Sequence, residues 1–163
     1  MMRHAPAALS VAPPATRADW RDARRLVEEY AATLGVDLQF QDFAAELANF
    51  EREYAAPAGA FLLARDAGAA IGCVGLRRFD DDRGEIKRLY VVPAARSRGA
   101  GAALVHGIVA AGRRLGYARL VLDTLPSMTA AQELYRRLGF RPVAPYRFNP
   151  VPGTVFLELA LRA

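Results

Sequence analysis

A glycine-rich turn, Arg96-Ser97-Arg98-Gly99-Ala100-Gly101, is the strongest chemical feature of the sequence. It follows an apolar stretch and precedes a segment whose apolar residues recur at helical spacing. A turn that opens a helix presents free backbone N–H groups at the positive end of the helix dipole, which suits a pyrophosphate. Gly99 and Gly101 would let phosphates approach the main chain, while Arg96 and Arg98 would add charged donors. A tight turn without a ligand explains the two glycines equally well.

Other phosphate-binding and catalytic interpretations find less support in the sequence. A dinucleotide-binding fold needs a third glycine and a strand–helix–strand unit near the N-terminus, and the sequence has neither. Cys73 could be a nucleophile, but its apolar neighbours predict a buried, inert thiol. His4 lies in the terminal segment and His106 in the helix after the glycine turn, neither with a visible partner, so we expect both to be inert. The sequence has no cluster of metal ligands, so we expect no metal.

The elements that must position the turn alternate between helical and strand periodicity. Thr16, an N-cap with Asp19 three residues later, begins a helix that ends at Gly35. A second amphipathic helix carries Phe40, Phe43, Leu47 and Phe50 on one face. The order β-α-α-β-β-β-α-β-α-β-β predicts an α/β fold, a central mixed sheet flanked by helices. The remaining helices are expected over residues 99–115 and 127–138, and the strands over 7–11, 60–64, 70–77, 85–92, 118–123, 140–143 and 154–161.

Two motifs in this order resemble the GNAT superfamily of N-acetyltransferases. The segment Glu85 to Leu104, with Arg96-x-x-Gly99-x-Gly101 after a strand, is similar to the superfamily's acetyl-CoA-binding motif. The run Ala131-x-x-Leu134-Tyr135-x-x-x-Gly139-Phe140 resembles its second hallmark, a helix that passes under the cofactor and enters the next strand. The resemblance is weakest before Ala60. It implies the GNAT acyl-CoA N-acyltransferase fold, as a single domain over residues 1–163.

The resemblance also implies where acetyl-CoA binds. The pyrophosphate is expected on the backbone from Arg98 to Gly101. The pantetheine arm is expected to exchange main-chain hydrogen bonds with a strand edge, and a backbone N–H of that edge would stabilise the oxyanion. In the family this strand splays from its neighbour, here the strand of Asp123, and leaves a cleft for the thioester. Many members have Asn in place of Met128, and that Asn often touches the cofactor. The expected cofactor-binding residues are Leu89, Tyr90, Val91, Arg96, Ser97, Arg98, Gly99, Ala100 and Gly101.

The implied reaction is direct attack of a neutral amine on the thioester, without a covalent enzyme intermediate. An amine resembling lysine has a pKa of about 10.4, so a base is useful at neutral pH. Glu85 lies eleven residues before Arg96 and matches the glutamate used as the base in the histone-acetylating branch. Its alternative role is an exposed strand-end carboxylate paired with a neighbouring arginine. Tyr135 is the candidate acid for the leaving sulfur, and its alternative role is a core aromatic.

We expect the acceptor to be a small-molecule amine. In the superfamily the first two helices and the loop before the last strand wall the acceptor cleft. That loop, Pro145-Tyr146-Arg147-Phe148-Asn149-Pro150, is stiffened by prolines, and Arg147 could pair with a carboxylate on the acceptor. One alternative is a protein or peptide N-acetyltransferase, which would need an open groove. The other is a non-catalytic acyl-CoA-binding or sensing domain, against which the retained Glu85 and Tyr135 argue.

Composition limits the partners. The 163 residues are 53% hydrophobic and 24% charged, a balance typical of a soluble globular domain. The net charge is +5 and Lys87 is the only lysine, but no arginine-rich run interleaved with aromatics predicts a nucleic-acid surface. No apolar run is long enough to cross a membrane. Cys73 is the only cysteine, which favours a cytoplasmic location. We therefore expect acetyl-CoA and a small amine as partners, and a homodimer is left open.

Overall fold

A computed structural model of the chain describes residues 9–38 and 42–162. Its centre is a seven-stranded mixed sheet with the strand order β1-β2-β3-β4-β5-β7-β6. Neighbouring strands are antiparallel except for β4 and β5, which are parallel. The strands are β1 (Leu9–Ala12), β2 (Ala60–Asp66), β3 (Ala69–Arg78), β4 (Arg83–Val91), β5 (Arg119–Thr124), β6 (Arg141–Pro142) and β7 (Val155–Ala160).

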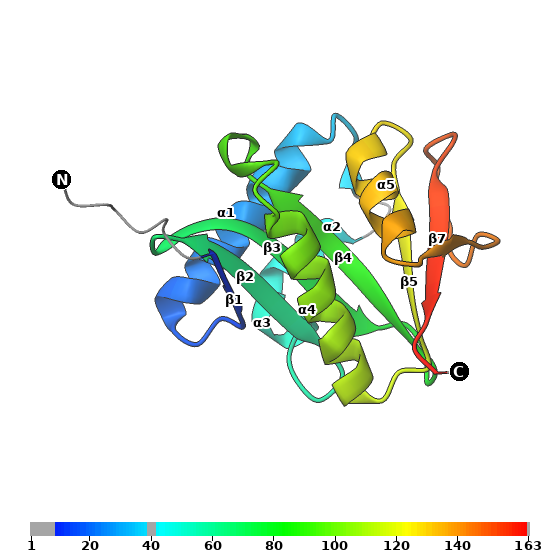
Figure 1. The fold of residues 1–163 in the computed structure, drawn as a ribbon, viewed down its shortest axis with the longest axis horizontal. Coiled ribbons are helices and arrows are strands. Elements are labelled where there is room, and N and C mark those ends of the chain that lie inside the picture. Colours follow the sequence, from blue (N-terminus) through cyan, green and yellow to red (C-terminus); the bar gives the residue numbers. More distant parts are fainter. Residues whose placement is uncertain (1–8, 39–41, 163) are drawn as a thin grey trace.

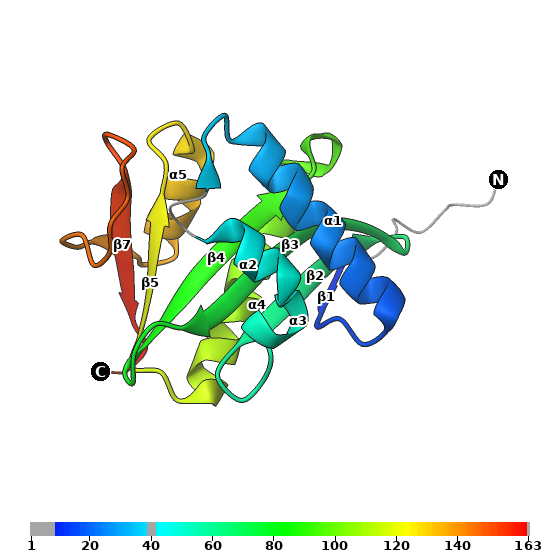
Figure 2. The same cartoon turned by 180° about the vertical axis from the view of Figure 1, so that it is seen from behind.

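Helices cover both faces of the sheet, which confirms the expected architecture. One face carries α4 (Ala100–Leu115) and α5 (Thr129–Arg137), seen in front of the sheet in Figure 1. The other carries α1 (Arg17–Thr33), α2 (Phe43–Ala48) and α3 (Phe50–Glu53), seen in front in Figure 2. Each face has its own apolar cluster. Within the described residues, no helix combines the length and apolar character needed to cross a membrane.

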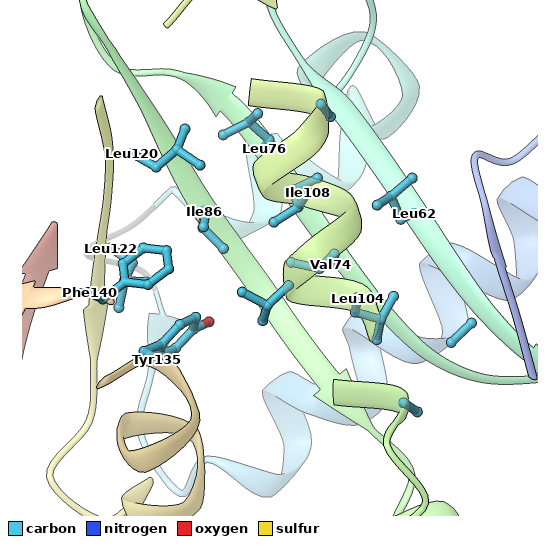
Figure 3. Packing of buried hydrophobic residues seen from close by; sticks show 14 of the residues in the cluster. Leu62, Val74, Leu76, Ile86, Leu104, Ile108, Leu120, Leu122, Tyr135 and Phe140 are labelled. Carbon is cyan, nitrogen blue, oxygen red and sulfur yellow. The ribbon is translucent and has the colours of Figure 1, made fainter. Parts of the chain in front are cut away.

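The core beneath α4 is built from its periodic apolar face. Leu104 and Ile108, one helical turn apart, are fully buried against Leu62 of β2 and Val74 and Leu76 of β3 (Figure 3). Burying a side chain of this size contributes about 1.5–3 kcal/mol. Because α4 is thus fixed on the sheet, its first turn stays in a defined position beside the end of β4.

The predicted cap of α1 is confirmed. Thr16 Oγ1 accepts a hydrogen bond from the Asp19 amide at 3.1 Å, and Asp19 Oδ2 accepts one from the Thr16 amide at 3.1 Å. This capping box satisfies two amides that the helix itself leaves without partners. Ala23, Leu26 and Val27 then bury one face of the helix against the sheet.

Two predicted elements are shorter than expected. The second helix is divided into α2 and α3 at Asn49, whose amide and side-chain Nδ2 both donate to the carbonyl of Ala45 at 3.2 Å. This side-chain bond competes with continued helical bonding and ends α2. Phe40 lies outside the described residues. The strand expected over 140–143 reduces to the two residues of β6, because Pro142 has no N–H to extend the ladder.

Candidate active site

The parallel strands β4 and β5 separate after a short paired segment, as the family resemblance predicts. Arg83, Gly84 and Glu85 pair with residues 119–121 of β5, and the pairing ends there. The two strands diverge visibly toward the end of β4 in Figures 1 and 2. The edge of β4 that faces β5 is therefore unpaired from Ile86 onward. Its main-chain groups are available to a ligand that lies along it.

A β-bulge in β4 directs neighbouring side chains to different sides. Cys73 and Gly75 of β3 pair with Tyr90 and Lys87, so β4 has one residue more than its partner over this stretch. Arg88 occupies the left-handed region with φ 63°. Its guanidinium pairs with Glu46 of α2 through two contacts of 3.0 Å, whereas Lys87 reaches toward β5.

A groove of about 660 Å³ lies between the end of β4, the glycine-rich turn and α5. Arg98 is not among the residues that line it; its side chain is 61% exposed and pairs with Asp66 at 3.1 Å. The structure thus brings most of the predicted cofactor residues together. Those that line the groove are Leu89, Tyr90, Val91, Arg96, Ser97, Gly99, Ala100 and Gly101.

The turn presents backbone N–H groups rather than arginine side chains. Ser97 and Gly99 adopt φ values of 68° and 86°, and no side chain caps the start of α4. Glycine suits position 99 because residues with a side chain rarely adopt a positive φ of this size. The Nε of Arg96 donates to the carbonyl of Val91 at 3.0 Å and ties the turn to the end of β4. The first amides of α4 are therefore the natural donors to an anion.

A smaller cavity of about 40 Å³ adjoins the groove where β4 and β5 separate. The two spaces share four lining residues, so they are neighbouring parts of one site. The cavity has room for a few water molecules. The shared residues are Leu34, Leu89, Met128 and Ala131.

Lys87 and Asp123 form a buried ion pair in the wall of this cavity. Lys87 Nζ lies 3.9 Å from Asp123 Oδ1, and the two side chains are 3% and 4% exposed. Asn149 donates from Nδ2 to Asp123 Oδ2 at 3.0 Å. Burial lowers the pKa of Lys87 to about 8, although Glu85 and Asp123 favour its charged form.

Glu85, the predicted base, is fully buried in β4 and lines neither space. Its carboxylate accepts hydrogen bonds from Arg77 Nε at 3.2 Å, the Tyr146 hydroxyl at 2.8 Å and an Arg147 terminal nitrogen at 2.8 Å. Arg147 Nε also lies 2.8 Å from Glu85 Oε2, but its N–H is not aligned for a hydrogen bond. The pairing with arginine matches the alternative role considered for Glu85, but its complete burial differs from the exposed position expected there. Its role as the base stays a prediction.

Tyr135, the predicted acid, makes the core contacts of its alternative role, and its role as the acid stays a prediction. Its ring packs edge-on against Phe140, with centroids 5.2 Å apart, and its hydroxyl points away from α5 (Figure 3). The residue also lines the small cavity. Burial raises the pKa of Tyr135 above its usual value, so the hydroxyl stays protonated at neutral pH and remains a hydrogen-bond donor.

The remaining candidates from the sequence are one cysteine and two histidines. Cys73 is fully buried and donates its S–H to the carbonyl of Arg88 at 3.3 Å. Burial raises the pKa of its thiol, which disfavours the nucleophilic thiolate. His106 is exposed on α4, and His4 lies outside the described residues. No group of residues suited to holding a metal occurs in the described part of the chain.

Sequence reasoning missed four polar residues of the cavity wall, namely Tyr30, Lys87, Asp123 and Asn149. Burial raises the pKa of Tyr30 to about 12, and its hydroxyl lies 3.9 Å from the sulfur of Met128. A usable signal was present for Asp123, because it directly follows the apolar run Leu120-Val121-Leu122 of β5. Such residues are seldom buried without a specific reason.

Comparisons with known proteins agree with this geometry. The model of the Acetyltransferase (GNAT) family matches residues 20–140. An uncharacterized N-acetyltransferase of Schizosaccharomyces pombe is 40% identical over 158 residues, covering 96% of this chain and 97% of that protein.

Solved structures share the fold. A GNAT-family acetyltransferase from Staphylococcus aureus Mu50 has a TM-score of 0.78 at 21% identity, covering 95% of this chain and 100% of its own. YncA, a putative acetyltransferase from Salmonella typhimurium solved with its cofactor acetyl-CoA, has a TM-score of 0.70 at 20% identity, covering 94% of each chain. Together with the family match over most of the chain, these similarities establish that the protein belongs to the GNAT family of acetyltransferases and is an acyltransferase.

Proposed function

We propose that this protein transfers the acetyl group of acetyl-CoA to a primary amine of a small molecule. The observation that supports this proposal most is that two spaces adjoin and share lining residues. They are the groove at the glycine-rich turn and the charged cavity where β4 and β5 separate. A phosphate-binding turn, a free strand edge and a polar end cavity are the three parts that acetyl transfer needs. The related fold that holds acetyl-CoA supports the choice of co-substrate.

In this proposal the backbone of residues 98–101 binds the pyrophosphate, and the β4 edge from Leu89 to Val91 binds the pantetheine arm. The pairing of β4 with β5 ends at Glu85, so this edge is open to an added hydrogen-bonding partner. A backbone N–H of the same edge stabilises the oxyanion of the tetrahedral intermediate. Arg98 adds only long-range positive charge, because its guanidinium pairs with Asp66.

The chemistry proposed is direct attack of the neutral amine on the thioester carbon. The C–N bond forms, the C–S bond breaks, and the sulfur leaves with the bonding electrons. Tyr135 donates a hydrogen bond to this sulfur. Because burial raises the pKa of Tyr135, we assign it the role of a donor that stabilises the thiolate rather than that of a strong acid.

Glu85 keeps the role of base as a testable prediction. A proton would have to reach its carboxylate by displacing one of the donors from Arg77, Tyr146 and Arg147. The hydrogen bonds of Glu85 support a second role in addition to that of base. In this role Glu85 holds the loop before β7, residues 145–150 and here called the late loop, against β4.

The anchoring of the late loop supports a small acceptor. Tyr146 and Arg147 bond to Glu85, and Asn149 bonds to Asp123, so the loop is tied to both separating strands. This contact narrows the space that an extended peptide would need. Phe148 is 74% exposed, so its ring does not help to anchor the loop. The guanidinium of Arg147, expected to meet an acceptor carboxylate, is engaged by Glu85 instead.

The test is a thiol-release screen of the purified protein with acetyl-CoA and separate sets of amino acids, polyamines, aminoglycosides and peptides, with product masses. We expect CoA release and an acetylated product with compact amines. Asn149→Ala should weaken this activity by freeing the loop, whereas Arg114→Ala, an exposed change at the far end of α4, should not. Turnover of peptides alone would contradict the small-molecule proposal. Acetyl-CoA binding without any turnover would favour a sensing domain.

A further inference from the structure

The charged residues in and around the cavity beside the groove are paired with opposite charges. Lys87 faces Asp123 across 3.9 Å. Arg88 is paired with Glu46, and Arg147 with Glu85. Within the described residues, Asp123 is therefore the one carboxylate in the cavity wall, and its cationic neighbour is Lys87.

An amine acceptor reaches this wall as an ammonium ion, because free primary amines have pKa values of about 10. Beside Asp123 it would place a second cation against the one carboxylate of the described cavity wall. Glu85, the other carboxylate that acts on Lys87, is already paired with Arg77 and Arg147. Like charges in a buried site disfavour one another, and the effect is larger than in water. The arrangement is stable when Lys87 and the acceptor share one proton between them.

We propose that Lys87 is the proton acceptor of the transfer reaction, taking the proton of an acceptor ammonium that Asp123 holds in place. The inference rests on the proposed function and names a further catalytic residue for it. It assigns Glu85 the role of a positioning residue, which holds Arg147 and Tyr146 and supplies negative charge near Lys87.

The proton balance of the step closes. Neutral Lys87 takes one proton from the acceptor R–NH₃⁺, which becomes R–NH₂ and attacks the thioester carbon. The C–S bond breaks as the amide forms, and the second nitrogen proton passes to the sulfur with the help of the Tyr135 hydroxyl. Lys87 then releases its proton to solvent. The products are the acetylated amine, CoA–SH and one proton.

The surroundings of Lys87 place its titration in a useful range. Burial lowers the pKa of Lys87 to about 8, with Arg88 and Arg77 acting in the same direction and Glu85 and Asp123 opposing it. A base with a pKa near the working pH is the most effective. The other titratable and charged groups that face this region are Tyr30 of α1, Glu46 of α2, Tyr135 of α5, and Tyr146 and Arg147 of the late loop.

The first experiment uses the fact that Lys87 is the only lysine of the chain. Protein grown with ¹³C-labelled lysine gives a single side-chain Cε signal, which reports the ionisation of Lys87 by NMR without any turnover. We expect a midpoint near pH 8 in the CoA-loaded protein. Asp123→Asn should lower it, because the carboxylate favours the charged lysine. Methylammonium should lower it in the wild type but not in Asp123→Asn. A midpoint near that of free lysine would overturn the proposal.

The second experiment compares pH profiles of kcat/KM. The wild type should gain activity through pH 8, and Lys87→Met should lose roughly 10²-fold and that rising limb, since general-base catalysis contributes about this much. Lys87→Arg, which keeps a permanent charge, should be as slow. Arg114→Met, an exposed cation removed from the far end of α4, is the matched control. Acetyl-CoA affinity, measured by calorimetry, should be unchanged in all of these variants.

The outcomes separate the two proposals. If no amine is acetylated at any pH, the proposed function fails, whatever the NMR titration shows. If the wild type is active and Lys87→Met keeps the same pH profile with unchanged acetyl-CoA affinity, only the role of Lys87 fails. A loss of activity in Glu85→Gln that keeps the rising limb but moves it to lower pH would support the positioning role of Glu85, because this variant removes negative charge near Lys87. Complete loss of the limb in this variant would overturn that role.

Discussion

Tyr135 packs in the core and is also the residue that we propose as the hydrogen-bond donor to the leaving sulfur, because of where it sits on α5. Its ring contacts Phe140 in the core, while the residue lines the cavity beside the cofactor groove. One side chain therefore connects the hydrophobic core to the chemistry. Lys87 and Asp123 differ from it, because burying a charged group costs free energy that apolar packing does not return, and the two are buried as an ion pair.

Removing the hydroxyl of Tyr135 separates its two roles. Tyr135→Phe keeps the ring and should leave the free energy of unfolding nearly unchanged. Acetyl transfer should slow by about 10²-fold, the usual loss when one donor to a developing anion is removed. Tyr117→Phe is the matched control, because the Tyr117 hydroxyl donates to the carbonyl of Ala58 at 2.5 Å, far from the groove. That variant should lose stability and keep its rate. If Tyr135→Phe transfers acetyl at the wild-type rate, and chemistry is shown to be rate-limiting, then Tyr135 has only a packing role.

At the scale of elements, α4 and β4 create the cofactor groove together. The buried face of α4 fixes its first turn, and the early end of the β4–β5 pairing opens the strand edge beside it. The bulge at Arg88 then turns that side chain toward α2 and leaves Lys87 facing β5. Neither element would form a site without the other.

The two ends of α4 provide a controlled test of the glycine-rich turn. Gly99 and Gly116 have φ values of 86° and 87°, and a Cβ at either would meet no atom within 4 Å. Replacing each by Val should therefore cause a similar loss of stability through backbone strain. Only Gly99→Val should abolish acetyl-CoA binding, measured by calorimetry on the folded proteins, because only Gly99 lies in the groove. Equal acetyl-CoA affinities in the two variants would contradict the placement of the pyrophosphate at this turn.

Across the whole molecule, buried ion pairs join segments that are distant in sequence. Glu46 of α2 binds Arg88 of β4, and Arg77 of β3 contacts both Glu46 and Glu85. Glu85 in turn holds the late loop through Arg147. The network thus spans the chain from α2 to the segment before β7 and surrounds the separated ends of β4 and β5.

Breaking this network should cost far more than breaking a surface pair. Glu46→Ala removes the carboxylate that pairs with the buried guanidinium of Arg88 and should lower the free energy of unfolding by about 3–5 kcal/mol. Glu28→Ala, which removes an exposed pair with Arg24, should cost less than about 1 kcal/mol. Both are measured by urea denaturation at neutral pH.

The pH dependence gives a further check on the same variant. Burial acts to raise the pKa of Glu46, but Arg88 and Arg77 hold it below its usual value. The stabilisation is therefore complete above the ordinary glutamate pKa and is lost as the pH falls through the lower, folded-state value. The difference between wild type and Glu46→Ala should shrink over that acidic range. A constant difference would show that packing alone is lost.

The sequence by itself determined the order of elements, the cap of α1 and the position of the glycine-rich turn. These follow from local rules: helical and strand periodicity, a capping box at Thr16 and Asp19, and two glycines at a helix start. The same rules missed the end of α2 at Asn49, where a side-chain hydrogen bond competes with the helix. They also made the strand at residues 140–143 longer than the two residues of β6.

Tertiary structure alone decided which charges meet. Lys87 and Asp123 are 36 positions apart, and only the parallel pairing of β4 and β5, followed by their separation, brings them to one cavity. The sequence suggested for Glu85 either a base or a carboxylate paired with a neighbouring arginine, but the loop before β7, about sixty residues further on, supplies two of its hydrogen-bond donors. Periodicity reports which face a residue occupies, whereas ionic partners depend on long-range contacts that no local spacing encodes.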